Sequence, residues 1–273
     1  MNMINQPPIL HFESIEASGN VTAFTTTRYG GYSSGNYASF NLSYYSGDLT
    51  GNVDKNREEL CRIIHILPDR LFAPYQVHGD EIFIIDECFL HEKAERKDPL
   101  LNGKDALITS FKDICIAVST ADCVPVLLYD PGKQIIGAVH AGWRGTCKRI
   151  LQKVIRQMVT IWESDPSKLY AAIGPSIGPD AFEVGDEVYR SFAEESFDME
   201  LIARYHQSSG KYHIDLWEAN RLQLISEGVQ QEKIEIAGIC TRQHTDAFFS
   251  ARELGISSGR MLTGICMHSG KQN

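Results

Sequence analysis

The sequence predicts a mixed α/β or α+β fold built in layers, and three observations lead to this prediction. Helical and strand-like patterns are mixed along the 273 residues without a regular strand–helix–strand order, which disfavours a Rossmann fold or a TIM barrel. Apolar runs at 114–119, 124–129 and 135–139 are typical of strands that are covered on both faces. No stretch resembles a linker, so we expect one domain over residues 1–273, with residues 1–19 as an N-terminal arm.

The first half of the chain is predicted to contain short strands and one amphipathic helix. Residues 21–27 are rich in Thr and Val, which favours a strand, and the glycine-rich stretch 28–40 is predicted to be a loop. Apolar side chains at helical spacing predict a helix over 52–66. The other elements expected here are strands at 72–77 and 81–85 and a charged loop at 87–104.

The second half is predicted to contain longer helices. Residues 145–162 carry apolar side chains at helical spacing, which predicts a helix with one buried stripe. Residues 169–173 are expected to form a strand that ends at Gly174-Pro175. Gly228 suits the left-handed end of a helix over 216–228. The other expected elements are a helix at 185–194 and strands at 234–239 and 261–266.

Composition places the chain among globular proteins and excludes some classes of binding partner. Hydrophobic residues make up 43% and charged residues 22% of the chain, and its formal net charge is −9. Ligands of nucleic acid or of anionic membranes have basic surfaces, so neither partner is expected. We expect no membrane span and no secretory signal, because no apolar run has the required length. Seven cysteines without a CxxC pair are typical of unpaired thiols, so a cytoplasmic protein is expected.

Two histidines and a cysteine share a position at the ends of predicted strands. His78 is followed by glycine, His140 by Ala-Gly, and Cys123 lies between two apolar strands. Strand ends can converge at one rim of a sheet, and two imidazoles with one thiolate suit Zn²⁺ and leave a fourth coordination position open. The alternative is that each side chain packs in the core. Asp122 could support the ligands or transfer protons, and Asp105 could cap a strand turn.

Two arginines are candidate ligands of an anion. Arg144 lies between glycines where a strand is expected to turn into a helix, so its guanidinium could bind phosphate there. A solvated arginine in a tight turn is the alternative. Arg28, at the head of the glycine-rich loop, is the second candidate. The aromatic residues that could stack on a flat base, or pack in the core instead, are Trp143, Phe248 and Phe249.

These segments together resemble the YfiH family, which was once described as multicopper polyphenol oxidoreductase or laccase-like and later as purine nucleoside phosphorylases. The resemblance extends from about residue 20 to residue 266, and its most specific part is Thr120 to Gly145. Two segments, 42–48 and 250–253, depart from the family pattern. The matching motifs include Thr25–Gly31, Gln76–Gly79, Asp105–Leu107, Thr120–Leu128, His140–Gly145, Ile173–Pro179 and Phe248–Ser250.

The resemblance implies a single-domain α/β/β/α sandwich with a metal centre on His78, Cys123 and His140. It also implies phosphorolysis of purine nucleosides such as adenosine, inosine, guanosine and methylthioadenosine, with adenosine deamination as a side activity. Zn²⁺ is the expected metal and copper is the alternative. Purine nucleosides and phosphate are the expected partners, and no oligomeric state is predicted.

On this hypothesis Asp122 and Cys123 are the catalytic residues, and Arg28 and Arg144 bind phosphate. One alternative is a copper-dependent polyphenol oxidase, which needs more ligands than one group of three. Another is a metal-free cysteine hydrolase with Cys123 as nucleophile and a histidine as base. A binding or scaffold protein with a structural metal is the non-enzymatic alternative.

Overall fold

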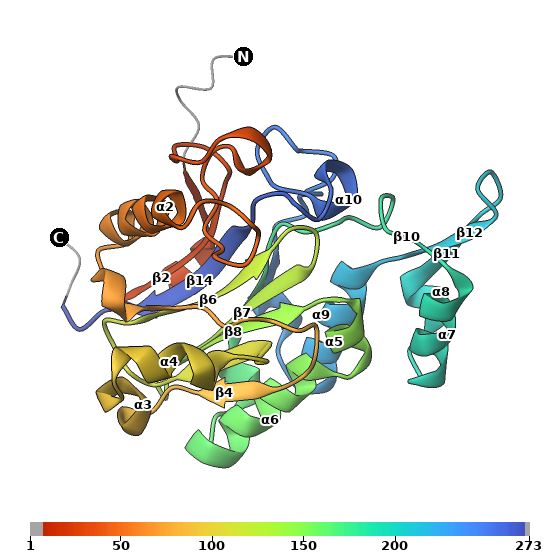
Figure 1. Ribbon diagram of the computed structural model, residues 1–273. Coiled ribbons are helices and arrows are strands. Elements are labelled where there is room, and N and C mark those ends of the chain that lie inside the picture. Colours follow the sequence, from red (N-terminus) through yellow and green to blue (C-terminus); the bar gives the residue numbers. More distant parts are fainter. Residues whose placement is uncertain (1–7, 271–273) are drawn as a thin grey trace.

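The computed structural model describes residues 8–270 and contains two β-sheets packed face to face between outer helices (Figure 1). The first sheet consists, in spatial order, of β1 (Ile9–His11), β2 (Val21–Thr26), β14 (Met261–Met267), β6 (Cys115–Thr120) and β3 (Leu71–Phe72). The second consists of β13 (Ile234–Ile236), β9 (Tyr170–Ile173), β7 (Val124–Asp130), β8 (Ile135–Ala141), β5 (Ala106–Thr109) and β4 (Ile82–Ile84). A small third sheet contains β10 (Glu183–Val184), β12 (Lys211–Ile214) and β11 (Ala203–His206).

Helices cover both outer faces of the paired sheets. Helix α2 lies over the first sheet, and α5, α6 and α9 lie over the second (Figure 1). The helices are α1 (Glu13–Glu16), α2 (Thr50–Ile63), α3 (Glu87–His91), α4 (Ala94–Leu101), α5 (Trp143–Cys147), α6 (Ile150–Trp162), α7 (Asp186–Glu194), α8 (Met199–Ile202), α9 (Leu216–Ser226) and α10 (Ala251–Leu254). The expected layered α/β/β/α sandwich is confirmed.

Three apolar layers hold the sandwich together. Val118 of β6 and Leu127 of β7 belong to the layer between the two sheets. Leu60 of α2 packs in the layer outside the first sheet, and Val154 of α6 packs in the layer outside the second. Every residue of β7 and β8 is buried, which confirms the prediction from their continuous apolar runs.

Several sequence predictions need correction at the level of elements. The strand expected at 72–77 ends at Phe72, and the chain then runs irregularly towards His78. The helix expected at 145–162 is two helices, because Arg149 adopts left-handed backbone angles between α5 and α6. The charged loop expected at 87–104 forms α3 and α4 instead, since Phe89 and Leu101 bury one face of this segment. The third sheet was not expected.

Other predicted elements are present with small shifts in their bounds. The glycine-rich stretch 28–40 is a loop with one short 3₁₀ turn, as expected. Gly228 ends α9 with a φ of 96°, which confirms the predicted left-handed cap. Part of the N-terminal arm is ordered as β1 and α1, and residues 1–7 lie outside the described chain. Among residues 8–270, no helix has both the length and the apolar character that a membrane crossing requires.

Candidate metal centre

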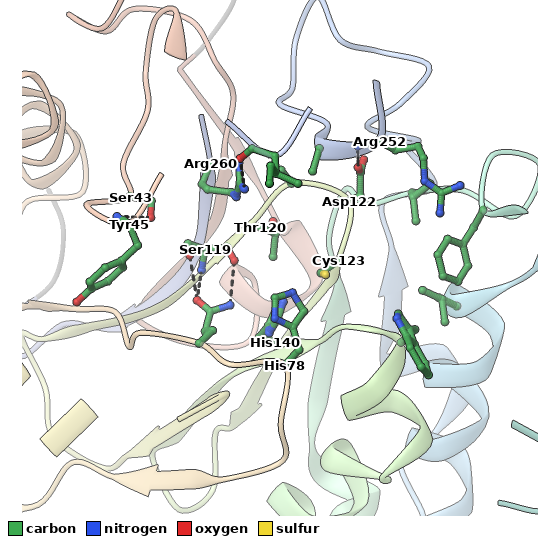
Figure 2. Close-up of a pocket in the computed structure, with 18 of the residues that line it drawn as sticks. Ser43, Tyr45, His78, Ser119, Thr120, Asp122, Cys123, His140, Arg252 and Arg260 are labelled. Atoms are coloured by element: carbon green, nitrogen blue, oxygen red, sulfur yellow. Dashed lines mark hydrogen bonds between the residues drawn. The ribbon is translucent and has the colours of Figure 1, made fainter. Parts of the chain in front are cut away.

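Three ligating side chains meet at one end of the second sheet. The antiparallel pairing of β7 with β8 places Pro125 opposite His140, so Cys123, two residues earlier, comes close to the end of β8. His78 reaches the same point from the irregular segment after β3. The ligating atoms of His78, Cys123 and His140 all lie within 4.8 Å of one another (Figure 2). The three side chains therefore converge as expected, although His78 does not lie at the end of a strand.

The local backbone is adapted to this meeting point. A β-carbon on Gly142 would lie 3.2 Å from Cys123 Sγ, 3.3 Å from His78 Cδ2 and 3.5 Å from His140 Cε1, so only glycine leaves the three side chains their full room. His78 has a φ of 60° and Asp122 a φ of 89°. Left-handed backbone angles are unfavourable for residues other than glycine, so these two positions hold strain that the surrounding contacts must offset.

A buried carboxylate orients two of the three ligands. Asp105 Oδ1 lies 2.7 Å from His140 Nδ1 and accepts a hydrogen bond from the backbone N–H of His78 at 3.0 Å. Asp105 Oδ2 accepts from the backbone N–H of Gly79 at 2.7 Å. Because an ionised carboxylate can only accept, Nδ1 of His140 carries the proton and Nε2 is left as the ligating nitrogen. Asp105 thus does more than cap a turn, which was its expected role.

Electrostatics favour the ligating form of the cysteine. Burial alone would raise the pKa of the Cys123 thiol, but the nearby charge of His140 and hydrogen bonds to His140 and His78 lower it to about 6. Burial would lower the pKa of His140, whereas the Cys123 thiolate and Asp105 raise it to about 9. The thiolate is the state of Cys123 that binds metals, and His140 must give up its second ring proton when a metal binds.

The three ligands line a cavity of about 570 Å³ (Figure 2). This volume lies within the usual range for small-molecule sites, about 300 to 1,000 Å³. Aromatic rings line parts of its wall, and the cationic side chains in its lining are two arginines. These six residues are Tyr45, Tyr75, Trp143, Phe182, Arg252 and Arg260. The cavity therefore joins the candidate metal ligands with surfaces suited to a flat ring and to an anion.

Both predicted phosphate ligands lie outside the cavity lining. Arg28 donates to the carbonyl oxygens of Ala38 at 2.8 Å and Thr245 at 2.6 Å, and its guanidinium lies over Phe249. Arg144 is exposed and stacks on its neighbour Trp143, 4.3 Å from the ring centre. The structure therefore does not bring Arg28 and Arg144 together with the three metal ligands.

The other predicted residues divide between the cavity and the core. Trp143 lines the cavity, but Phe248 and Phe249 are buried in a core cluster behind the lining residues Ala121 and Ala251. Asp122 lines the cavity, with both carboxylate oxygens engaged: Oδ1 accepts from the Thr241 hydroxyl and Oδ2 from the backbone N–H of Arg252, each at 2.7 Å.

Sequence reasoning missed Arg252 and Arg260 as cavity residues. Arg252 falls in the segment 250–253, which departs from the family pattern, and Arg260 lies in the Gly259-Arg260 pair before the last strand. The family resemblance includes Gly259-Arg260 as a matching motif and 250–253 as a departure, but it assigned neither arginine a role in the site. The turn at 121–123 and the loop before β14 bring them to the cavity only in the folded chain.

Comparison with known proteins identifies the family. A family model described as multi-copper polyphenol oxidoreductase laccase matches residues 22–268. A purine nucleoside phosphorylase of Bacteroides thetaiotaomicron is 45% identical over 260 residues, which cover 95% of this chain and 96% of that protein. The crystal structure of the hypothetical protein YfiH of Bacillus licheniformis superposes with a TM-score of 0.88 at 29% identity, covering 97% of this chain and 98% of that one. The chain belongs to the YfiH family.

A further relative of this YfiH-family chain carries a second activity in its name. Adenosine deaminase RL5, from an unknown prokaryotic organism, is 43% identical over 197 residues, which cover 72% of this chain and 75% of that protein. The named relatives share most of their length with this chain, so the YfiH-family protein described here is an enzyme.

Proposed function

We propose that this protein is a metal-dependent purine nucleoside phosphorylase, with adenosine deamination as a side activity. The observation that carries the proposal is the meeting of His78, Cys123 and His140 in the wall of a cavity that also presents aromatic rings and arginines. The names of two similar relatives point to the same pair of reactions. Adenosine, inosine, guanosine and methylthioadenosine are the proposed nucleosides, and phosphate is the proposed second substrate.

The three donors fit an open zinc site. Two imidazole nitrogens and one thiolate are borderline ligands that Zn²⁺ accepts, and three protein ligands leave a position for water or substrate. All three residues line the cavity, so a substrate bound there could approach a metal that they held. A zinc ion held there would supply Lewis-acid and water-activating chemistry. We propose Zn²⁺ as the resident metal, with copper as the alternative.

In phosphorolysis, an oxygen of phosphate forms a bond to the anomeric carbon of the ribose while the bond from that carbon to the purine nitrogen breaks. The bonding electron pair leaves with the purine, which takes up a proton. The protein must therefore hold the phosphate beside the ribose and hold the base in place. We assign the first task to the cavity arginines instead of Arg28 and Arg144, and the second to the aromatic wall formed by Trp143 and Phe182.

In deamination, water adds to C6 of adenine and ammonia leaves. Asp122 is well placed for a supporting role, because its carboxylate holds the Thr241 hydroxyl and the first turn of α10. We propose that Asp122 positions Arg252 at the cavity, and that the role of Cys123 in catalysis is ligation of the metal. The seven free cysteines suit a reducing compartment, so we place both reactions in the cytoplasm.

Incubation with adenosine, with and without phosphate, tests the proposal directly. Chromatography separates adenine plus ribose phosphate, the products of phosphorolysis, from inosine, the product of deamination. We expect both activities in the metal-loaded wild type and loss of both in His78→Ala and Cys123→Ala. Absence of both products with pure, metal-loaded wild type would remove the assignment. Unchanged rates in the two variants would remove the site.

A metal-free cysteine hydrolase is the second candidate, favoured by the lowered pKa of Cys123 beside two histidines. Activity that survives chelation and is lost on alkylation of Cys123 would favour it. A copper oxidase is less well supported. Among residues 8–270 the His, Cys, Asp and Glu side chains form a single group of three or more that could hold an ion, whereas multicopper centres need more ligands.

A further inference from the structure

We propose that Arg260 and Thr120 form the subsite for inorganic phosphate in this cavity. The inference rests on the proposed phosphorolysis and names the side chains that would hold the attacking anion. Two independent observations support it: a half-buried guanidinium without a carboxylate partner, and a buried hydroxyl without a hydrogen-bond partner. Both belong to residues that line the cavity.

Arg260 supplies a positive charge that no carboxylate of the described residues pairs with directly. Its guanidinium donates to the carbonyl oxygens of Ile256 at 2.9 Å, Ser258 at 2.6 Å and Gly259 at 2.9 Å, which fix its position. Within residues 8–270, it makes no ion pair with a carboxylate. Burial lowers the pKa of Arg260, and the nearby charges of Cys123 and Asp122 offset only part of this effect. A charge withdrawn from water is costly unless an opposite charge compensates it, so an anion in the cavity would relieve this cost.

Thr120 supplies a neutral donor beside this charge. Its side chain is 1% exposed, and its Oγ1 atom has no hydrogen-bond partner among the described residues. Thr120 pairs with Met261 across β6 and β14, so Arg260, the residue before Met261, lies at the same end of this strand pair (Figure 2). Buried hydroxyls are nearly always hydrogen-bonded in native proteins, so an orphaned one in a cavity wall indicates a missing partner.

The combination of groups selects an oxyanion over a sugar hydroxyl. A guanidinium only donates hydrogen bonds, and a phosphate oxygen can accept from it and from a threonine hydroxyl at the same time. A ribose hydroxyl would leave the charge of Arg260 uncompensated. Arg252 is a weaker candidate because it is exposed and its guanidinium donates to the Glu183 carbonyl oxygen at 3.1 Å. Arg252 and Arg260 lie on opposite sides of the turn that carries Cys123 (Figure 2).

The decisive variant is Thr120→Val, which removes the hydroxyl and keeps the shape of the side chain. We expect the KM for phosphate in phosphorolysis to rise about tenfold or more, as for the loss of a hydrogen bond to a charged group. We expect the KM for the nucleoside to change less than about twofold, because the substitution leaves the binding of the nucleoside unchanged. Thr120→Ser retains the hydroxyl and should restore the wild-type KM for phosphate. A rise in the nucleoside KM with an unchanged phosphate KM would overturn the proposal.

Folding of the variant has its own control. Thr120→Val removes a hydroxyl that has no partner, so its melting temperature should equal or exceed that of the wild type. Thr109→Val is the matched control: the Thr109 hydroxyl is equally buried but donates to the Ile85 carbonyl oxygen at 2.9 Å, so this variant should melt at a lower temperature. A Thr120→Val protein that melts well below the wild type would show that the hydroxyl has a partner within the protein.

Calorimetric titration with inorganic phosphate separates the subsite from the reaction. We expect binding to the wild type, about tenfold weaker binding to Thr120→Val, and no measurable binding to Arg260→Met. If the wild type catalyses phosphorolysis and both variants bind phosphate as tightly as the wild type does, the subsite is wrong and the proposed function stands. Phosphate binding that is lost in both variants, in a protein that cleaves no nucleoside, would overturn the function and leave the subsite standing.

Discussion

The side chains of all three candidate ligands pack against Gly142. Its φ of −60° is open to any residue, so the backbone does not require glycine there, and the need for glycine arises only from side-chain proximity. We expect Gly142→Ala to weaken zinc binding about tenfold, because its methyl group would push apart atoms that must converge on one ion. Competition with a chromogenic chelator measures this affinity.

Gly51→Ala is the control for that substitution. Gly51 lies in α2, and a β-carbon there would meet nothing within 4 Å. This control should keep the zinc affinity of the wild type and gain helix stability of about 1 kcal/mol. Equal zinc affinity in Gly142→Ala and in the wild type would show that the three ligands tolerate a wider spacing than the structure has.

Asp105 acts on the metal ligands through two separate oxygens. In Asp105→Asn, one oxygen becomes an amide N–H₂, which cannot accept, so either His140 or the backbone of Gly79 loses its acceptor. We expect zinc affinity to fall 10- to 100-fold, the usual effect of removing a partner of a metal-bound histidine. Asp80→Asn is the control. Asp80 directly follows Gly79 in the chain, but its carboxylate pairs with Lys148 and Lys153 and not with a metal ligand. If both variants bound zinc as the wild type does, Asp105 would have no positioning role.

The residues that sequence reasoning found and missed differ in how the fold brings them together. Cys123 lies directly before β7 and His140 near the end of β8, where pattern and topology restrict their position. His78 lies in an irregular segment, and the strand expected before it ends at Phe72. Arg252 and Arg260 lie in loops whose path depends on tertiary contacts. Asp105 was predicted only as a turn cap, because its contact with His140 arises when β5 pairs with β8. The ligand atoms were therefore predictable and most of their surroundings were not.

At the scale of elements, α9 packs against α5 and lines part of the cavity. Asn220 of α9 donates to the Thr146 hydroxyl of α5 at 3.2 Å, and Gln223 donates to the Thr146 carbonyl oxygen at 3.0 Å. These contacts connect α9 with the helix that follows His140, and Leu216 at the start of α9 lines the cavity. Helix α9 therefore holds the helix that follows His140 and contributes to the cavity wall.

The start of α9 provides a test at this scale. The Asp215 carboxylate accepts from the backbone N–H of Glu218 at 2.9 Å and caps the helix. We expect Asp215→Ala to lower the free energy of unfolding by about 1 kcal/mol in urea titrations, and Asp215→Asn, which can also cap, to lower it much less. Equal losses in both variants would mean that tertiary packing alone fixes the beginning of α9.

Elements were predictable where burial alone determines them. Strands β7 and β8 are buried along their whole length, so their apolar runs identify them without a partner. The strands of the third sheet are short and partly exposed, and they exist only because they pair with each other. The break between α5 and α6 was not predictable, because Arg149 adopts left-handed angles that its residue type does not signal.

At the scale of the whole molecule, the charge distribution is the unusual property. The chain carries a net charge of −9, yet the cavity at the candidate metal ligands presents two arginines and, with a metal bound, would present a further positive centre. The overall field opposes the approach of an anion, so affinity for phosphate must come from local, partly buried groups where solvent screens little. This contrast explains why the site could not be inferred from composition, which indicates only the absence of basic partners.

A metal that binds only the folded chain must stabilise the whole molecule. The three ligands come from sequence positions 45 and 17 residues apart and from both sides of the β6–β7 turn, so unfolding separates them. We expect zinc to raise the melting temperature, with a stabilisation of about 2.7 kcal/mol when free zinc is 100 times its Kd. The shift should disappear in Cys123→Ser and persist in Cys88→Ser, which alters an exposed cysteine outside the cavity lining. Differential scanning fluorimetry over a zinc titration measures it, and a full shift in Cys123→Ser would place the stabilising ion elsewhere on the protein.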